Sequence, residues 1–106
     1  MSIKEKKCVP CEGRVPRLTD EQAAELHQQI PSWELREFEI TKSFRFKNFV
    51  EAMKFVNRMA DLAEQEGHHP DFGVHYDRVD ITIWTHAIGG LSENDFILAA
   101  KIDDLR

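Results

Sequence analysis

The hydrophobic period of this chain switches repeatedly along its length, and this alternation most constrains its fold. Residues 20–29 and 48–66 carry apolar side chains at helical spacing, three or four positions apart. Residues 33–46 instead alternate apolar with polar side chains, which is typical of half-buried strands. The period of two returns over residues 74–85, and a further helical segment follows over 92–104. The predicted order is therefore α-β-β-α-β-β-α.

Capping residues support the predicted helix boundaries. Thr19, Asn48 and Ser92 each precede a helical segment, and each is followed three positions later by an acidic or amide side chain, as in a capping box. Pro31 prevents the first helix from continuing, and Gly67 predicts the end of the second.

The predicted strands come in two pairs joined by short turns, so each pair must be antiparallel. A change of parity after Leu35 indicates a turn or bulge near residues 36–37. In the second pair, strands at 74–76 and 79–85 flank a tight turn at 77–78. We therefore predict an α+β fold: a four-stranded antiparallel sheet with three helices packed on one face. The side chains of that pair expected to face the core are Val79, Ile81 and Ile83.

Trp84 is predicted on the sheet face opposite the helices, beside Thr82. A large apolar side chain on that face is either exposed or covered by a second subunit, and we favour association.

Length and charge limit the class of protein. The chain has 106 residues, 42% of them hydrophobic, and a formal net charge of -5. These values suit one domain over residues 19–106, preceded by a flexible N-terminal arm at 1–18. No apolar run approaches the roughly 20 residues that span a bilayer, and no apolar segment follows the basic start, so we expect a cytoplasmic protein without a membrane partner. The acidic balance, without a visible basic face, argues against direct nucleic-acid binding.

Cys8 and Cys11 both lie in the predicted arm, three positions apart. A structural zinc site usually needs a second pair of ligands, which the chain does not offer at matching spacing. We expect two reduced thiols on a mobile arm. A local disulfide, a redox role and a metal shared between subunits remain alternatives.

Three of the five histidines lie where predicted elements end, which is where sites are often built. They are His68, His69 and His86. Because Pro70 follows His69, the backbone there is extended, and two adjacent imidazole rings must point in different directions.

Two acidic residues are placed to support these imidazoles. Glu64, in the last turn of the second helix, is within reach of an imidazole N–H, and Asp95, near the start of the third, is expected to do the same for His86. Taken singly, each of these residues is also consistent with an ordinary solvated or helix-terminal position. Together they predict a histidine cluster with carboxylate support.

The motifs around these residues resemble the signature of the pterin-4a-carbinolamine dehydratase family. The similar stretches are the sequence from Glu64 through GHHPD at 67–71, YDRV at 76–79, Thr-His at 85–86 and GLSEND at 90–95. The resemblance extends from about Thr19 to Asp103. The double histidine, a third histidine after a threonine, and the following Gly-Leu-Ser with an aspartate make it specific.

The resemblance implies a hydro-lyase that converts 4a-hydroxytetrahydropterin to quinonoid dihydropterin and water, recycling the cofactor of an aromatic amino-acid hydroxylase. It also implies homodimers or homotetramers, a pterin substrate, and no metal or organic cofactor. Carried over by position, the family's active-site histidines correspond to His68, His69 and His86, its supporting acids to Glu64 and Asp95, and its site-shaping proline to Pro70.

Histidine suits this reaction, because loss of water from a carbinolamine needs a proton donor and imidazole titrates near neutral pH. We assign proton donation to His68 or His86, from opposite sides, and pterin binding to His69. Phe72 and Ala87 depart from the family pattern and affect the expected pocket shape. A non-catalytic dimerisation or assembly module, and a metalloenzyme with histidine ligands, are the alternatives.

Overall fold

A computed structural model describes residues 2–9 and 16–106. The elements, in chain order, are η1 (Ile3–Glu5), α1 (Asp20–His27), β1 (Glu34–Leu35), β2 (Ile40–Arg45), α2 (Phe49–Glu66), β3 (Asp71–His75), β4 (Arg78–Ile83), η2 (His86–Ile88) and α3 (Glu93–Asp103). Apart from the short 3-10 helices η1 and η2, this is the predicted order, and the α+β assignment is confirmed.

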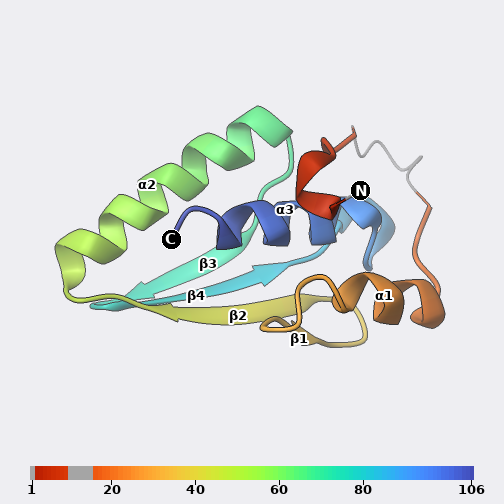
Figure 1. Cartoon of the computed structure of the whole chain (residues 1–106), viewed down its shortest axis with the longest axis horizontal. Helices are drawn as coiled ribbons and strands as arrows, with labels where there is room; N and C mark the ends of the chain where they lie inside the picture. The colour runs from red at the N-terminus through yellow and green to blue at the C-terminus, as the bar shows by residue number, and fades with distance from the viewer. Residues whose placement is uncertain (1, 10–15) are drawn as a thin grey trace.

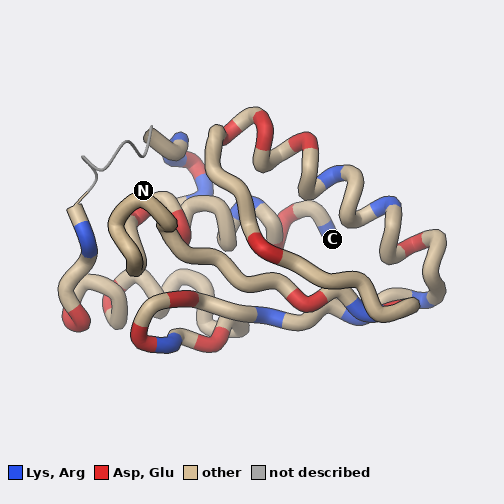
Figure 2. The backbone as a smooth tube through the Cα atoms, turned by 180° about the vertical axis from the view of Figure 1, so that it is seen from behind, with Lys and Arg blue, Asp and Glu red and all other residues tan. Residues whose placement is uncertain are grey.

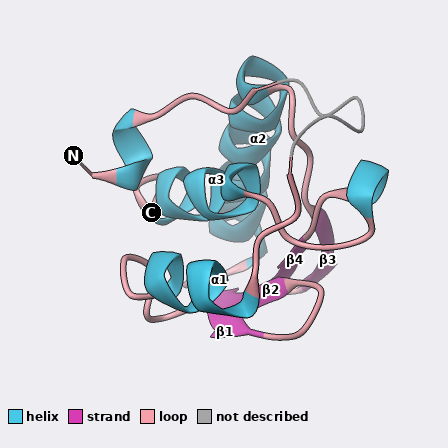
Figure 3. Cartoon of the chain, turned by 90° about the vertical axis from the view of Figure 1, so that its right-hand side faces the viewer, coloured by secondary structure: helices cyan, strands magenta, loops and turns pink. Residues whose placement is uncertain are grey.

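The four strands form one antiparallel sheet in the order β1-β2-β4-β3. The two sequential pairs thus meet along β2 and β4, where Phe44 lies opposite Val79 and Ile40 lies opposite Ile83. All three helices lie on the same side of the sheet (Figure 1), and α3 runs between α1 and α2 (Figure 3).

The core fills the space between the inner face of the sheet and the helices. The alternation along β4 is realised as predicted, since Val79, Ile81 and Ile83 are fully buried. Phe44 packs on Phe55 of α2, with ring centroids 4.9 Å apart. Because the sheet and α2 cover α3 from two sides, nearly every side chain of α3 is buried, including polar ones.

The second strand pair differs from its predicted boundaries. β3 begins at Asp71 instead of residue 74, and the turn consists of Tyr76 and Asp77, since His75 pairs with Arg78. Aspartate and glycine at the start of this strand are poor strand formers, and pairing with β4 overrides that local preference. The earlier start of β3 brings Asp71 next to the histidine segment.

Part of the segment predicted as a flexible arm is packed on the domain. Ile3 and Cys8 are both buried, and η1 lies against α3 (Figure 1). Cys11 lies outside the described residues, so the state of the cysteine pair stays a prediction. The domain boundary at residue 19 likewise stays a prediction.

Two further features concern partners. Along the described backbone, acidic positions are interspersed with basic ones on the strands and on α2 (Figure 2). Among the described helices, none has the length and apolar character needed to cross a membrane.

Candidate active site

A cleft of about 400 Å³ opens where α2 ends, β3 begins and β4 runs into η2. Its walls bring together three histidines predicted from the sequence, together with Pro70. The lining residues are Gly67, His68, His69, Pro70, Asp71, Trp84, Thr85, His86 and Ala87.

Two short loops position the histidines. α2 ends at Gly67, whose φ of 66° is a left-handed conformation that glycine adopts without strain, and the chain turns there to deliver His68. The second loop follows β4 and begins at Thr85. Its backbone N–H donates to the carbonyl of Gly90 at 2.8 Å, which closes the loop that carries His86.

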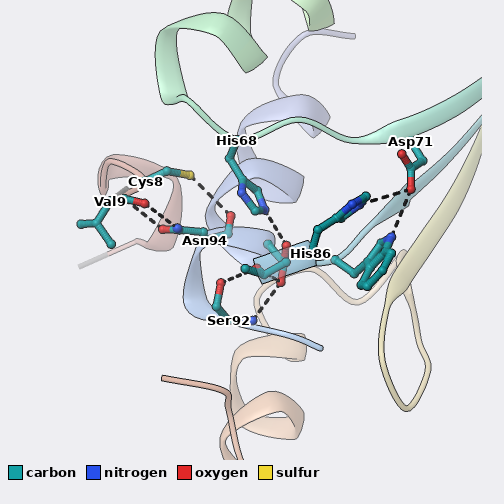
Figure 4. A network of polar contacts seen from close by, with 10 residues as sticks. Cys8, Val9, His68, Asp71, His86, Ser92 and Asn94 are labelled. Carbon is teal, nitrogen blue, oxygen red and sulfur yellow. Dashed lines mark hydrogen bonds and ion pairs between the residues drawn. The ribbon is translucent and has the colours of Figure 1, made fainter. Parts of the chain in front are cut away.

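His68 is held by a buried carboxylate. Its Nε2 lies 2.6 Å from Oδ1 of Asp95, and the two side chains are 7% and 0% exposed. The other oxygen of Asp95 accepts hydrogen bonds from the Thr85 hydroxyl at 2.9 Å and from the Ser92 backbone N–H at 2.8 Å. Figure 4 shows this network of contacts. A carboxylate with both oxygens bound in this way fixes the imidazole in one orientation.

The partner of Asp95 differs from the prediction. We expected Asp95 to support His86, and the structure places it against His68 instead. The start of α3 lies under the turn after α2, and His86 points away from it in the first turn of η2 (Figure 4).

His69 faces a different acid. Its Nε2 lies 2.5 Å from Oε2 of Glu64, five positions earlier in the last turn of α2, and both side chains are well exposed. The supporting role predicted for Glu64 is thus directed to His69. Because this pair is open to solvent, the ion pair contributes little to stability, and its main effect is on ring orientation.

His86 belongs to a third group, which the sequence did not reveal. Its ring stacks on the indole of Trp84, with centroids 4.0 Å apart and planes 26° from parallel. The indole N–H donates to Asp71 at 3.1 Å, and Nε2 of His86 lies 3.6 Å from the same carboxylate oxygen. Trp84 and Asp71 both form part of the cleft wall.

The arrangement can transfer protons and hold a flat ligand. Imidazoles with carboxylate partners exchange protons near neutral pH, and the exposed rings of His69 and His86 offer flat faces beside the cleft. Within residues 2–9 and 16–106, no group of three histidine, cysteine or acidic side chains converges closely enough to hold a metal ion.

Comparison with known proteins gives a family match. A family model described as pterin 4 alpha carbinolamine dehydratase matches residues 16–105. A protein of Rubrobacter xylanophilus that carries the name of this dehydratase is 50% identical over 104 residues, covering 97% of both chains. One of Methylococcus capsulatus with the same name is 45% identical over 106 residues, covering 98% of this chain and 93% of the other.

Two solved structures are also similar. A transcriptional coactivator/pterin dehydratase from Brucella melitensis superposes with a TM-score of 0.81 at 35% identity, covering 85% of this chain and 98% of the other. A pterin dehydratase-like protein identified as a RuBisCO assembly factor in the alpha-carboxysome gives a TM-score of 0.57 at 26% identity, covering 69% and 84%.

Proposed function

This chain belongs to the pterin-4a-carbinolamine dehydratase family, and we propose that it is a hydro-lyase converting 4a-hydroxytetrahydropterin to quinonoid dihydropterin and water. The observation that carries this proposal is the convergence of His68, His69 and His86 on one cleft. The cleft volume of about 400 Å³ falls in the range of small-molecule sites and suits a bicyclic heterocycle.

The chemistry of the substrate explains why the site is built from imidazoles. The bond between the ring carbon and its hydroxyl breaks only slowly if hydroxide must leave. When an imidazolium gives its proton to that oxygen, water leaves instead, and the lone pair of the adjacent ring nitrogen forms the new C=N bond. That nitrogen then loses its own proton to a base. The substrate supplies the electron pair, so the proposed reaction requires no metal or organic cofactor.

We assign the proton donation to His68. The Asp95 carboxylate 2.6 Å from its ring holds the imidazole in one orientation. General acid catalysis by a positioned side chain is typically worth about a hundredfold to ten-thousandfold in rate.

The other two histidines are assigned to the opposite wall and the rim. His86, stacked on Trp84, is placed to exchange a proton from the other side of the ligand, as base or acid. His69, oriented by Glu64, is assigned to binding the pterin ring. Pro70 is assigned to shaping the cleft, because a proline restricts the backbone of the residue before it, here His69, to extended conformations.

Partners follow from the proposed substrate. A hydroxylated pterin of this kind is the product of a pterin-dependent hydroxylase, and we propose a functional link to an aromatic amino-acid hydroxylase. We also propose a homodimer or homotetramer, as the family resemblance implies. Trp84, predicted on the outer face of the sheet, instead follows the end of β4 and lines the cleft.

A non-catalytic assembly module is the second candidate, because a pterin dehydratase-like protein of similar fold is described as a RuBisCO assembly factor. A module that only binds a partner has no need for imidazoles held by carboxylates. The histidine cluster of this chain therefore favours turnover.

Stopped-flow measurement of carbinolamine dehydration tests the proposal. We expect His68→Ala to lower kcat at least a hundredfold and His69→Ala to raise KM. His75→Ala is the matched control, since His75 is an exposed histidine of β3 that does not line the cleft. Equal rates with and without wild-type protein would exclude the enzyme and leave the assembly module.

A further inference from the structure

We infer that the N-terminal strap, defined as residues 3–9, holds the His68–Asp95 pair together, and that Asn94 and Glu66 are positioning residues through which it acts. The contacts of the strap are independent of what the cleft binds. Its effect on turnover rests on the function proposed above.

The side-chain amide of Asn94 makes two hydrogen bonds to the strap. Its Oδ1 accepts from the backbone N–H of Val9 at 3.0 Å, and its Nδ2 donates to the carbonyl of the same residue at 2.8 Å. The Cys8 thiol lies 3.5 Å from the backbone carbonyl of Asn94. Asn94 is only 2% exposed, and it directly precedes Asp95 in the first turn of α3 (Figure 4).

The carboxylate of Glu66, at the end of α2, also accepts a hydrogen bond from the strap. Its Oε1 accepts from the backbone N–H of Cys8 at 2.9 Å, and its Oε2 accepts from Lys101 at 2.8 Å. Burial tends to raise the pKa of Glu66, but the bonds from Lys101 and Cys8 outweigh it and hold the pKa below its ordinary value. Glu66 is the last residue of α2, two positions before His68.

The strap has its own attachment away from the cleft. Ile3 is 3% exposed within the hydrophobic core, and its backbone N–H donates to the side chain of Gln29 at 3.0 Å. Between these ends, Lys6 pairs with Glu93 at 3.0 Å, an exposed contact of small energetic weight. The buried Ile3 therefore anchors the segment that Asn94 and Glu66 hold near the site.

The geometry makes this a link between two elements that carry one catalytic pair. His68 follows α2 and Asp95 lies in α3, and the strap bonds to the neighbouring residue or near neighbour of each. Displacing reacting groups by about 1 Å can lower a rate a hundredfold, so a contact that fixes these two elements matters for catalysis. The strap lies before residues 16–105, which the family model matches, so that description does not account for it.

Asn94→Ala provides the main test, because it removes both hydrogen bonds to Val9 and deletes no side chain that lines the cleft. We expect kcat to fall about tenfold with KM changed less than about twofold. We also expect the imidazole ¹⁵N chemical shifts of His68 to move, since they report the ring proton held against Asp95.

Two further variants separate positioning from general destabilisation. Ile3→Ala removes the distant anchor of the strap and is expected to reproduce the fall in kcat and the shift of the His68 signals. It tests the inference even if Asn94→Ala does not fold. Ile102→Val is the control for lost stability, because it trims a fully buried side chain of α3 and removes none of the hydrogen bonds of the strap, and it should leave kcat and the His68 signals unchanged.

The outcomes distinguish this inference from the function on which it rests. Wild-type kcat and wild-type His68 signals in Asn94→Ala would overturn the inference. An equal fall of kcat in Ile102→Val would also overturn it, because loss of stability would then suffice. If the wild-type protein does not accelerate carbinolamine dehydration, the proposed function fails, and the His68 spectra of the same variants still decide whether the strap positions the pair.

Discussion

Asp95→Asn replaces the carboxylate that lies against His68 with a neutral side chain of nearly the same shape. In the wild-type protein, one oxygen of Asp95 contacts His68, and the other accepts from Thr85 and from the backbone N–H of Ser92. An asparagine has an acceptor oxygen at only one of these two positions, and an NH₂ donor at the other. Because the Ser92 N–H is part of the backbone and cannot turn away, we expect the amide oxygen to face Ser92 and the NH₂ group to face His68.

The size of the effect follows from this placement. An NH₂ group facing Nε2 forces the tautomer of His68 that carries no proton on Nε2, and the acceptor that Asp95 offers to that nitrogen is lost. Loss of a carboxylate that orients a catalytic imidazole lowers kcat by about a hundredfold to ten-thousandfold. The hydrogen-bonding groups left without a suitable partner at this position, where the side chain is 0% exposed, destabilise the fold by about 1–3 kcal/mol.

Stopped-flow dehydration kinetics and urea unfolding should be measured on the same preparations. The matched control is Asp103→Asn, the same substitution on the same helix, where the carboxylate accepts from Trp33 at 3.1 Å and from Lys42 at 2.7 Å. We expect the control to lose stability and to keep kcat within about twofold. If both variants lose similar stability and Asp95→Asn keeps wild-type kcat, the assignment of His68 as proton donor is wrong.

Four further predictions concern stability, binding and metal dependence. Glu66→Gln should destabilise the protein at pH 7. Because Lys101 and Cys8 lower the pKa of Glu66, its carboxylate stabilises the folded state only while it is ionised, so the difference in unfolding free energy from wild type should shrink below about pH 4.5. A constant difference in urea unfolding from pH 7 to 3 would contradict this. Gly67→Ala should cost about 1 kcal/mol in the same assay, because alanine is strained at a φ of 66°; an unchanged midpoint would argue against it. Trp84→Phe keeps the stacking ring but loses the bond to Asp71, so KM should rise by no more than about fivefold with kcat kept; a large fall in kcat would give Trp84 a direct role. Treatment with a chelator should leave the initial rate unchanged, and restoration of a lost rate by zinc would support a metalloenzyme.

The periodicity of the sequence was sufficient for the central elements of the fold. α2 combines an Asn48 cap, a broad apolar stripe and a left-handed Gly67, and its structure follows these signals at both ends. β4 alternates strictly, and its apolar set is buried. Local signals failed where neighbours decide the conformation. The start of β3 is set by pairing with β4, and the packing of Ile3 is set by a core that only the folded chain creates.

In the candidate site too, features set by local sequence could be predicted and features set by tertiary packing could not. The place of the histidine segment could be predicted, because Pro70 and the end of α2 are local in sequence. That Glu64 reaches an imidazole could also be predicted, because Glu64 lies in the last turn of α2. Its partner is His69, five positions later, because the chain turns at Gly67 after the helix. The pairing of His68 with Asp95 spans 27 positions and depends on how α3 packs beneath α2, which no local pattern encodes.

The position of Asp95 shows how the fold and the proposed chemistry share one group. Asp95 is the third residue of α3, and the bond that it accepts from the Ser92 N–H is a helix-capping interaction that forms whenever α3 forms. The backbone bond from Ser92 and the hydroxyl of Thr85 together hold one oxygen of Asp95, and the other oxygen is thereby directed at His68. The orientation of the proposed proton donor should therefore be as stable as the first turn of α3, the turn that Asn94 and the N-terminal strap hold in place.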